Sequence, residues 1–350
     1  VNCARLISGR LPGSLAQTNI VANMLFGAIS GSGTAAAAAI GGTMAPIELE
    51  EGYDKDYVAA VNIASAPTGQ LIPPSNTLIV YATVAGSVSV AALFMAGYIP
   101  GIAWGISLMF IAGYMAKKRG YVSTFSVTPK EALKVLWDAL PSLLLIIIVI
   151  GGILKGVFTA TEGSAIAVVY ALILSLCYRS LKIKDLPSII LSSCKTTCIV
   201  IFMIGVSSIM SWVMAYTMIP TAIANAMLSL SSNKYVILLL MNVILLVVGT
   251  FMDPTPAVLI FTPIFLPICQ SFGMDPVQFG IMIVFNLCIG TITPPVGVIL
   301  FTGCKVVGIS IEGVIKTLLP FFAAIAVVLL LVTYVPAMSM WIPSMLGLVK

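Results

Sequence analysis

The chain has 350 residues, of which 60% are hydrophobic and only 8% are charged. A soluble domain carries about 25% charged residues, so this composition excludes a water-soluble globular protein. The net charge of +5 does not indicate nucleic-acid binding, because the basic residues stand in short loops beside apolar runs, where they set membrane orientation. The sequence predicts an all-α polytopic membrane protein whose apolar exterior contacts the lipid bilayer.

The first predicted repeat covers residues 1–116. Two apolar arms surround Gly31–Thr34, and each arm is short for a span of about 20 residues. This pattern predicts a re-entrant helical hairpin over 11–47, with one long helix as the alternative. A broken helix over 56–86 and a span over 88–116 follow.

Residues 117–190 are predicted to form scaffold spans and connecting loops. The second predicted repeat covers residues 190–350. It consists of a span over 190–218, a hairpin over 234–271, a broken helix over 275–304 and a last span over 310–345.

The two predicted broken helices share a proline pair. Pro73-Pro74 has its counterpart, Pro294-Pro295, 221 positions later, and the same order of elements surrounds both pairs. The basic loops at 117–134 and 179–184 are separated by two spans and so share the cytoplasmic side. Counting crossings from there gives the two copies opposite orientations, which predicts an inverted-topology repeat. The alternative is two unrelated proline kinks.

The breaks suggest a binding function. Proline removes a backbone N–H and disfavours helical geometry at the preceding residue, so carbonyl groups are freed within the membrane. Irregular backbone at this depth is tolerated where it lines a cavity or finds a partner. Na⁺ is a suitable partner for carbonyl oxygens, and the helix that starts after each break favours an anionic substrate at its positive end.

Polar residues follow the first break but not the second. Ser75, Asn76 and Thr77 are candidates for substrate contacts, with helix N-capping as the alternative role. The matching positions after the second proline pair hold Val296 and Gly297. We therefore expect the first half to form polar contacts with the substrate and the second half to leave room for it.

Acidic residues near the predicted membrane core are also candidates. Asp253 stands at the tip of the second hairpin, and a charge at that depth costs about 2.5–3.5 kcal/mol on insertion scales. We expect it to bind Na⁺ or substrate, with an N-cap as the alternative. For Glu162 the start of a helix is the favoured interpretation.

Several functions have no support in the sequence. Histidine is absent and the seven cysteines are scattered, so we expect no transition-metal or redox cofactor. There is no Gly-x-x-x-x-Gly-Lys-Ser/Thr motif, so we expect no ATP. Without a nucleophile, base and acid in a recognisable set, an enzyme is not predicted.

Five segments together resemble the large membrane subunit of tripartite ATP-independent periplasmic (TRAP) transporters. They are Gly27–Gly33, Pro73–Thr77, Ala96–Gly101, Phe158–Glu162 and Phe251–Pro256. The run Pro-Pro-Ser-Asn-Thr-Leu-Ile-Val-Tyr is most similar to the sialic-acid branch. Since this family starts further upstream, the chain is expected to lack opening spans.

The resemblance implies an elevator mechanism in the bacterial inner membrane. A transport domain carrying both hairpins would move against a scaffold that a small membrane subunit steadies. A periplasmic substrate-binding protein would deliver a small organic acid, and Na⁺ would be the coupling ion.

The resemblance also implies site residues, most of them acting through backbone carbonyls. One sodium site is expected at Ser30, Ser32, Gly69, Ile72 and Pro74, and the other at Gly249, Asp253, Gly290, Thr293 and Pro295. The expected substrate contacts are Ser75, Asn76, Thr77, Gly33, Asp253, Val296 and Gly297.

The predicted function is sodium-coupled import of an organic acid, with sialic acid as the expected substrate. A C4-dicarboxylate transporter of the same family is the alternative. An ion channel is less favoured, because channels carry a continuous filter ring whereas two opposed hairpins suit alternating access.

Overall fold

The computed structural model describes residues 1–9, 11–86, 88–121, 129–218, 222–223, 226 and 233–349. Within these ranges the regular structure is helical, and no strand is present. Six helices in the described chain are long and apolar enough to cross a membrane. The chain is therefore an all-α, multi-pass membrane protein. The helices with the clearest spanning character are α6 (Val90–Arg119), α7 (Pro129–Leu154), α8 (Ala160–Cys177), α9 (Leu186–Tyr216), α12 (Pro254–Ser271) and α15 (Ile311–Tyr334).

The first hairpin consists of α2 (Ser14–Ser30) and α3 (Gly33–Glu50), which pack against each other. Gly31 ends α2 in the left-handed region, with φ 62°, which glycine adopts without steric cost. Ser32 then caps α3, because its side chain accepts a hydrogen bond from the Ala35 N–H. The chain therefore turns back at the Gly/Ser tip and does not continue as one long helix.

The helix that follows the hairpin is interrupted before the proline pair. The α-helix α4 (Lys55–Ser65) tightens into the 3₁₀ segment η1 (Ala66–Gln70), and α5 (Asn76–Ala85) starts after the break. The second half has the same plan, with hairpin helices α11 (Lys234–Gly249) and α12, then α13 (Pro276–Gly290), a break, and α14 (Val298–Val307). The peptide bond between the two prolines is cis in both breaks.

The long helices after the two breaks run in opposite directions. Helices α6 and α15 pack against each other, and Arg119 at the end of α6 lies beside Thr317 near the start of α15. Both helices begin alike, since Ser89 and Ser310 each cap the third following N–H. The two long helices are therefore antiparallel, whereas the inverted repeat as a whole stays a prediction.

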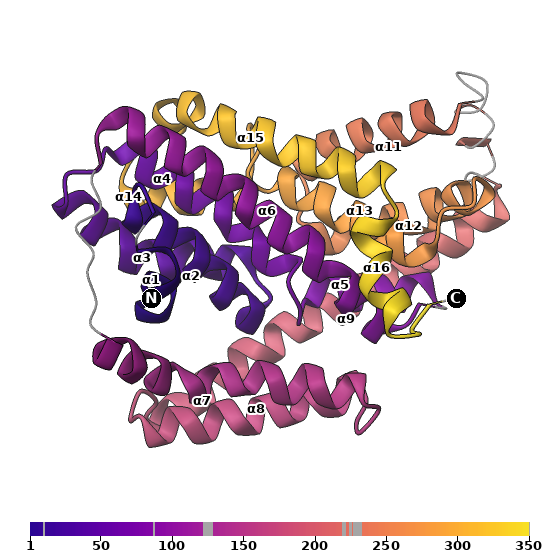
Figure 1. Ribbon diagram of the computed structural model, residues 1–350. Coiled ribbons are helices and arrows are strands. Elements are labelled where there is room, and N and C mark those ends of the chain that lie inside the picture. Colours follow the sequence, from indigo (N-terminus) through magenta and orange to yellow (C-terminus); the bar gives the residue numbers. More distant parts are fainter. Residues whose placement is uncertain are drawn as a thin grey trace.

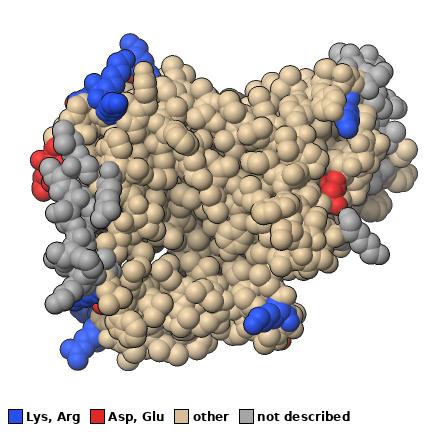
Figure 2. Space-filling model, viewed as in Figure 1, with Lys and Arg blue, Asp and Glu red and all other residues tan. Residues whose placement is uncertain are grey.

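A second layer lies below the main bundle in Figure 1. Helices α7 and α8 pack side by side there, and α9 leads from this layer toward α12. Apart from its ends, the visible surface carries few charged side chains (Figure 2), as a lipid-facing belt requires. Thr159 and Glu162 form a reciprocal capping box at the start of α8, which is the helix-start role favoured for Glu162.

The remaining helices are short. The region predicted as one last span over 310–345 contains two helices, because α15 ends before Pro336 and α16 (Ala337–Met345) follows as a separate helix that packs on α6. A proline cannot donate the backbone hydrogen bond that would continue the helix. The other short helices are α1 (Asn2–Ser8) and η2 (Ile183–Asp185).

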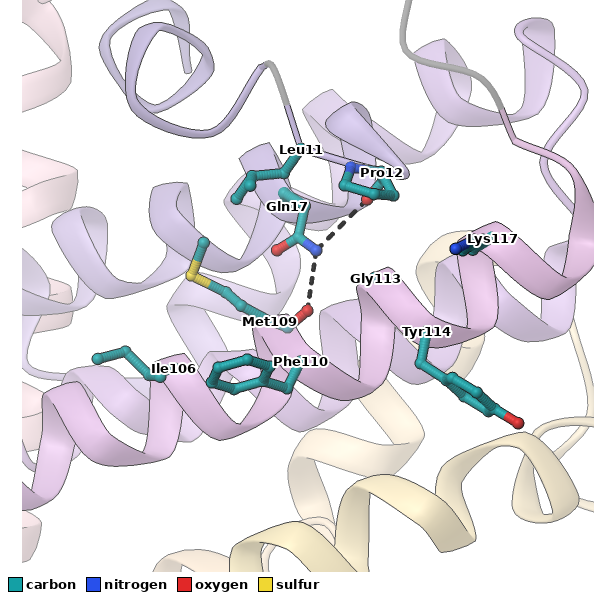
Figure 3. Close-up of a pocket in the computed structure, with 9 residues that line it drawn as sticks. All are labelled: Leu11, Pro12, Gln17, Ile106, Met109, Phe110, Gly113, Tyr114 and Lys117. Carbon is teal, nitrogen blue, oxygen red and sulfur yellow. Dashed lines mark hydrogen bonds between the residues drawn. The ribbon is translucent and has the colours of Figure 1, made fainter.

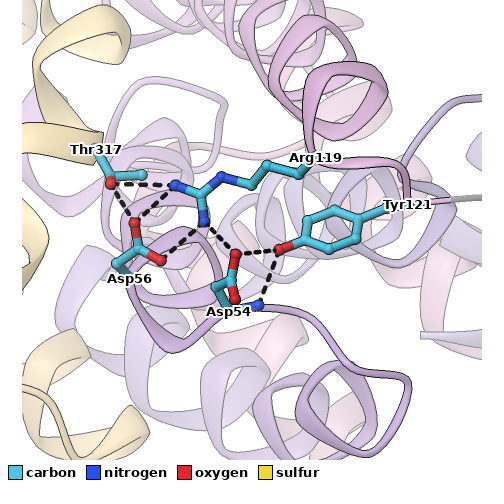
Figure 4. A network of polar contacts seen from close by, with 5 residues as sticks. All are labelled: Asp54, Asp56, Arg119, Tyr121 and Thr317. Carbon is cyan, nitrogen blue, oxygen red and sulfur yellow. Dashed lines mark hydrogen bonds and ion pairs between the residues drawn. The ribbon is translucent and has the colours of Figure 1, made fainter.

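An ionic network joins the two halves at the end of α6 (Figure 4). The Arg119 guanidinium donates to the Asp54 carboxylate at 2.8 Å and to both oxygens of Asp56 at 2.9 and 2.7 Å. The Thr317 hydroxyl, from the second half, donates to Asp56, and the Tyr121 hydroxyl donates to Asp54. Arg119 holds the pKa of Asp56 down to about 2, so the carboxylate stays ionised at neutral pH.

We predict that Arg119→Met destabilises the folded protein, since it leaves the partly buried Asp56 carboxylate without its cation. Hydrogen bonds to charged groups contribute about 1.5–3 kcal/mol each, so a clear decrease in the thermal unfolding temperature in detergent is expected. Lys118→Met is the control, because it removes an exposed charge next in sequence. Equal unfolding temperatures for the two variants would contradict a structural role for the network.

Candidate functional site

The first hairpin tip lies directly against the first break. Gly27 and Gly69 approach so closely that a Cβ atom added to Gly27 would stand 2.1 Å from the Gly69 Cα. Beside them, a Cβ on Gly31 would stand 3.1 Å from the Pro74 carbonyl oxygen. The contact is therefore made backbone to backbone, and it brings tip oxygens to the carbonyl groups that the break frees.

The second hairpin repeats this arrangement. A Cβ added to Gly290 would lie 2.3 Å from the Gly249 carbonyl carbon. In addition, the Gly297 N–H donates to the Thr250 carbonyl oxygen at 3.3 Å, which ties the tip to the second residue after the second proline pair. The glycine contacts occupy corresponding places in the two halves, because Gly69 and Gly290 are 221 positions apart.

The structure places the residues expected at the first sodium site either on the first tip or on the break that the tip contacts. The Ser30 hydroxyl accepts a hydrogen bond from the Ser32 N–H at 3.3 Å, so both belong to the tip that meets Pro74. Ile72 is buried and packs on Gly101 of α6. The available donors are hydroxyl and carbonyl oxygens, which are the ligands a hard cation prefers. They fit Na⁺ by chemistry.

At the second break, the threonine side chains form hydrogen bonds with backbone carbonyl groups. The Thr293 hydroxyl donates to the Ile289 carbonyl at 2.7 Å, while Pro295 is exposed. The Thr291 carbonyl accepts from the N–H groups of Ile299 and Leu300, so the break is bound to the start of α14. As at the first break, a cation here would meet backbone oxygens more than side-chain groups.

The two breaks meet through Gln70. The Cys288 thiol of α13 donates to the Gln70 side-chain oxygen at 3.1 Å, and the Ser75 hydroxyl donates to the Gln70 carbonyl. Gly33 of the first tip packs against Gln70 and against Ile299 of α14. Sequence reasoning did not identify Gln70 or Cys288, although a glutamine three residues before the proline pair is a polar group at membrane depth.

An open cavity of about 720 Å³ lies between α5, α9 and α12. Asn76, the first residue of α5, and Asp253, at the second tip, line it from opposite halves of the fold. Both are exposed. Asp253 also caps α12 by accepting from the Thr255 N–H at 3.4 Å, so its capping role and its exposure to the cavity coexist. A polar ligand here would meet the start of two helices.

The other residues expected to contact substrate are placed differently. Ser75 is fully buried as the N-cap of α5, accepting from the Leu78 N–H, and Thr77 is buried behind it. Neither lines the cavity, and the same holds for Gly33, Val296 and Gly297. Val296 is exposed, whereas Gly297 is buried with φ 32°.

The cavity also has polar residues that the sequence analysis did not propose. Thr196 and Thr197 of α9 and Thr255 of α12 line it beside Asn76 and Asp253. The threonine pair inside a long apolar run gave little signal, because Ser and Thr are common in membrane helices as packing residues. What the sequence did not reveal is that α9 crosses next to the second tip.

A second cavity, of about 450 Å³, lies between the α1–α2 loop and α6 (Figure 3). Its walls are mainly apolar, with Ile106 and Phe110 pointing along it, and Gln17 donates to the Met109 carbonyl at 2.9 Å. None of the predicted site residues lines it. It is therefore not the candidate substrate site.

The sequence of residues 1–338 matches the family described as "Tripartite ATP-independent periplasmic transporter, DctM component". The chain belongs to this family. Members of the family are transporter permeases and not enzymes, and they work with a substrate-binding protein and usually a small membrane subunit. The family assignment agrees with the resemblance seen in the sequence motifs.

Three relatives differ in the substrate that their names give. The chain is 41% identical to the isethionate TRAP transporter permease protein DctMQ of Oleidesulfovibrio alaskensis, covering 97% of this chain but 54% of that protein. It is 37% identical to the C4-dicarboxylate TRAP transporter large permease protein DctM of Pseudomonas aeruginosa, covering 99% and 82%. It is 35% identical to the sialic acid TRAP transporter large permease protein SiaM of Vibrio cholerae, covering 98% and 81%.

We predict that Gly69→Ala and Gly290→Ala each separate a hairpin tip from its break. Overpacking of this kind costs about 1–3 kcal/mol or more, because the added methyl group would meet backbone atoms that have no rotamer to change. Both variants should unfold at a lower temperature than wild type. The control is Gly42→Ala in α3, where no atom lies within 4 Å of the added Cβ and alanine favours helix. Unchanged unfolding of both break variants would disprove the close backbone contact.

Proposed function

We propose that this protein imports a small organic anion across the bacterial inner membrane, driven by Na⁺. The observation that carries the proposal is the pair of opposed hairpin tips, each packed on a proline break. This arrangement gathers backbone and hydroxyl oxygens at two places within the membrane, which suits two hard cations of low charge. A periplasmic binding protein and a small membrane subunit are the proposed partners.

An anionic substrate is supported by the cavity between α5, α9 and α12. The helices α5 and α12 both start at this cavity, and helix N-termini favour negative charge. Asp253 would repel an anion, so its proposed role is to hold Na⁺ or to bind a hydroxyl or amide group of the substrate. The Asn76 amide and the hydroxyls of Thr197 and Thr255 are the side-chain donors along the cavity wall, since the Thr196 hydroxyl donates to the Ser192 carbonyl at 3.1 Å.

An elevator mechanism fits the two layers of the fold. We propose that the bundle containing both hairpins moves against the layer of α7 and α8, with α9 as the connection between them. Import of two or more Na⁺ with one monoanion would move net positive charge inward, and each charge gains about 2.3 kcal/mol per 100 mV. The membrane potential would then add to the sodium gradient.

Sialic acid remains the proposed substrate on the strength of the segment Pro73–Tyr81, which is similar to the sialic-acid branch. Isethionate is the second candidate, because a relative named for isethionate transport is 41% identical to this chain. A C4-dicarboxylate is the third, on the same kind of support at 37% identity. Competition against uptake of each labelled acid, with the partner proteins present, distinguishes the three.

We predict that uptake into reconstituted vesicles requires Na⁺ and that Asp253→Ala abolishes most of the sodium-dependent component. The reason is the loss of a carboxylate at the second tip, where it faces the cavity. Initial uptake rates are measured against sodium concentration, with Asp275→Ala as the control, since Asp275 caps α13 away from the cavity. Uptake driven equally well by a proton gradient without sodium would refute the coupling.

A further prediction concerns substrate binding alone. Thr197→Val removes a hydroxyl from the cavity wall at nearly constant volume, so the KM for the transported acid should rise by roughly tenfold, as loss of one hydrogen bond of about 1.4 kcal/mol implies. The sodium dependence should not change. Thr83→Val, on an exposed face of α5 outside the cavity, is the control. An unchanged KM for Thr197→Val would remove α9 from the substrate site.

A further inference from the structure

Glu48 is a completely buried acid in the last turn of α3. The Asn19 side-chain amide donates to its two carboxyl oxygens at 3.4 and 3.3 Å. In the part of the chain that the structure describes, both ion pairs belong to Arg119, and neither includes Glu48. An isolated carboxylate in an apolar interior is costly, so the group takes up a proton and becomes neutral.

The ionisable groups around Glu48 do not supply a compensating charge. Tyr53, in the loop after α3, and Tyr57, on α4, are the titratable side chains that interact electrostatically with it. The guanidinium carbon of Arg119, on α6, lies 5.4 Å from the centroid of the Tyr57 ring. The charge of this arginine is already balanced by Asp54 and Asp56. Arg5 of α1 and Glu51 line the cavity beside Tyr53, and no ion pair in the described residues joins either of them to Glu48.

Buried polar side chains connect Glu48 to the first break. The Asn23 amide donates to the Asn19 side-chain oxygen at 2.8 Å and to the Ser65 hydroxyl at 2.9 Å. The Thr68 hydroxyl in turn donates to the Ser65 carbonyl at 2.6 Å, immediately before Gly69. The helix that carries Asn19 also carries Gly27, which contacts Gly69. A charge at Glu48 and a cation at the break are thus joined by one rigid, polar segment.

The second half of the fold has no acid at the matching place. Met241 and Cys269 follow Asn19 and Glu48 by 222 and 221 positions, and they form the corresponding contact between hairpin helices, with 3.6 Å between the two sulfur atoms. The two helices of a hairpin can therefore pack at this position without a carboxyl group. The first half has an acid at this position, whereas the second half has a cysteine.

A polar cavity lies near the end of α3. Tyr53 lines this cavity of about 210 Å³ together with Arg5, Ser14 and Glu51, and the Tyr53 N–H donates to the backbone carbonyl oxygen of Glu48. The cavity is therefore separated from the buried Glu48 residue by Tyr53.

We propose that Glu48 is a proton-binding site linked to the sodium site at the first hairpin tip. The carboxylate takes one proton from water when that site is empty, and the carboxylic acid returns it to water when Na⁺ binds, because the cation stabilises the charged form through the polar chain. By reciprocity, proton binding weakens Na⁺ binding. This linkage rests on the proposed sodium coupling.

The test is proton release from the purified membrane complex in weakly buffered detergent solution with a pH indicator. Adding NaCl to wild type should release a fraction of a proton per complex, with a maximum within a pH series, whereas choline chloride should release none. Glu48→Gln should abolish the release. Glu50→Gln, which neutralises an exposed carboxylate two residues away, should leave it unchanged. The double variant Asn19→Met, Glu48→Cys copies the pair that already packs in the second hairpin, and it should also release no protons.

Sodium binding is followed in the same samples by the increase in thermal unfolding temperature with NaCl. Sodium binding without proton release in wild type would overturn the role of Glu48 while leaving the proposed function intact. Equal release by wild type and both Glu48 variants would also overturn it. Absence of any sodium binding would instead reject the proposed coupling itself.

Discussion

The structure depends on four glycines that allow two hairpin tips to touch two broken helices. At each break the backbone leaves helical geometry inside the membrane, where no bulk water can satisfy the freed carbonyl groups. Gly27 against Gly69, and Gly249 against Gly290, bring the tip and break backbones into contact, and in the second half the Gly297 N–H donates to the Thr250 carbonyl oxygen. The same closeness gathers oxygen atoms in the two places where we propose that a cation binds.

The two halves share this device but differ in what surrounds it. Both have a serine-capped long helix after the break and an aspartate before the broken helix. Asp275 caps its own helix at 2.7 Å, whereas Asp54 is drawn into the Arg119 network. Likewise, the acid Glu48 stands where the second half has Cys269. At these positions one half of the fold can have a function, such as proton binding, that the other half does not have.

The fold class could be predicted from sequence because hydropathy, the proline pairs and the positive-inside rule act over short distances. The tips at Gly31 and Asp253 were also predictable, since glycine and capping residues interrupt otherwise apolar runs. The substrate cavity was not. Its wall on α9 depends on how a helix from the second layer crosses the second tip, and the burial of Ser75 depends on a hydrogen bond to Gln70. Such contacts are set by tertiary packing, which no local pattern records.

In the proposed mechanism each tip and break together hold one Na⁺. Equilibrium binding of radioactive sodium to the purified protein measures this occupancy. We expect saturable binding at two sites in wild type, loss of one site in Gly69→Ala, loss of the other in Gly290→Ala, and two sites retained in Gly42→Ala. Two sites of unchanged affinity in folded Gly69→Ala and Gly290→Ala proteins would contradict it.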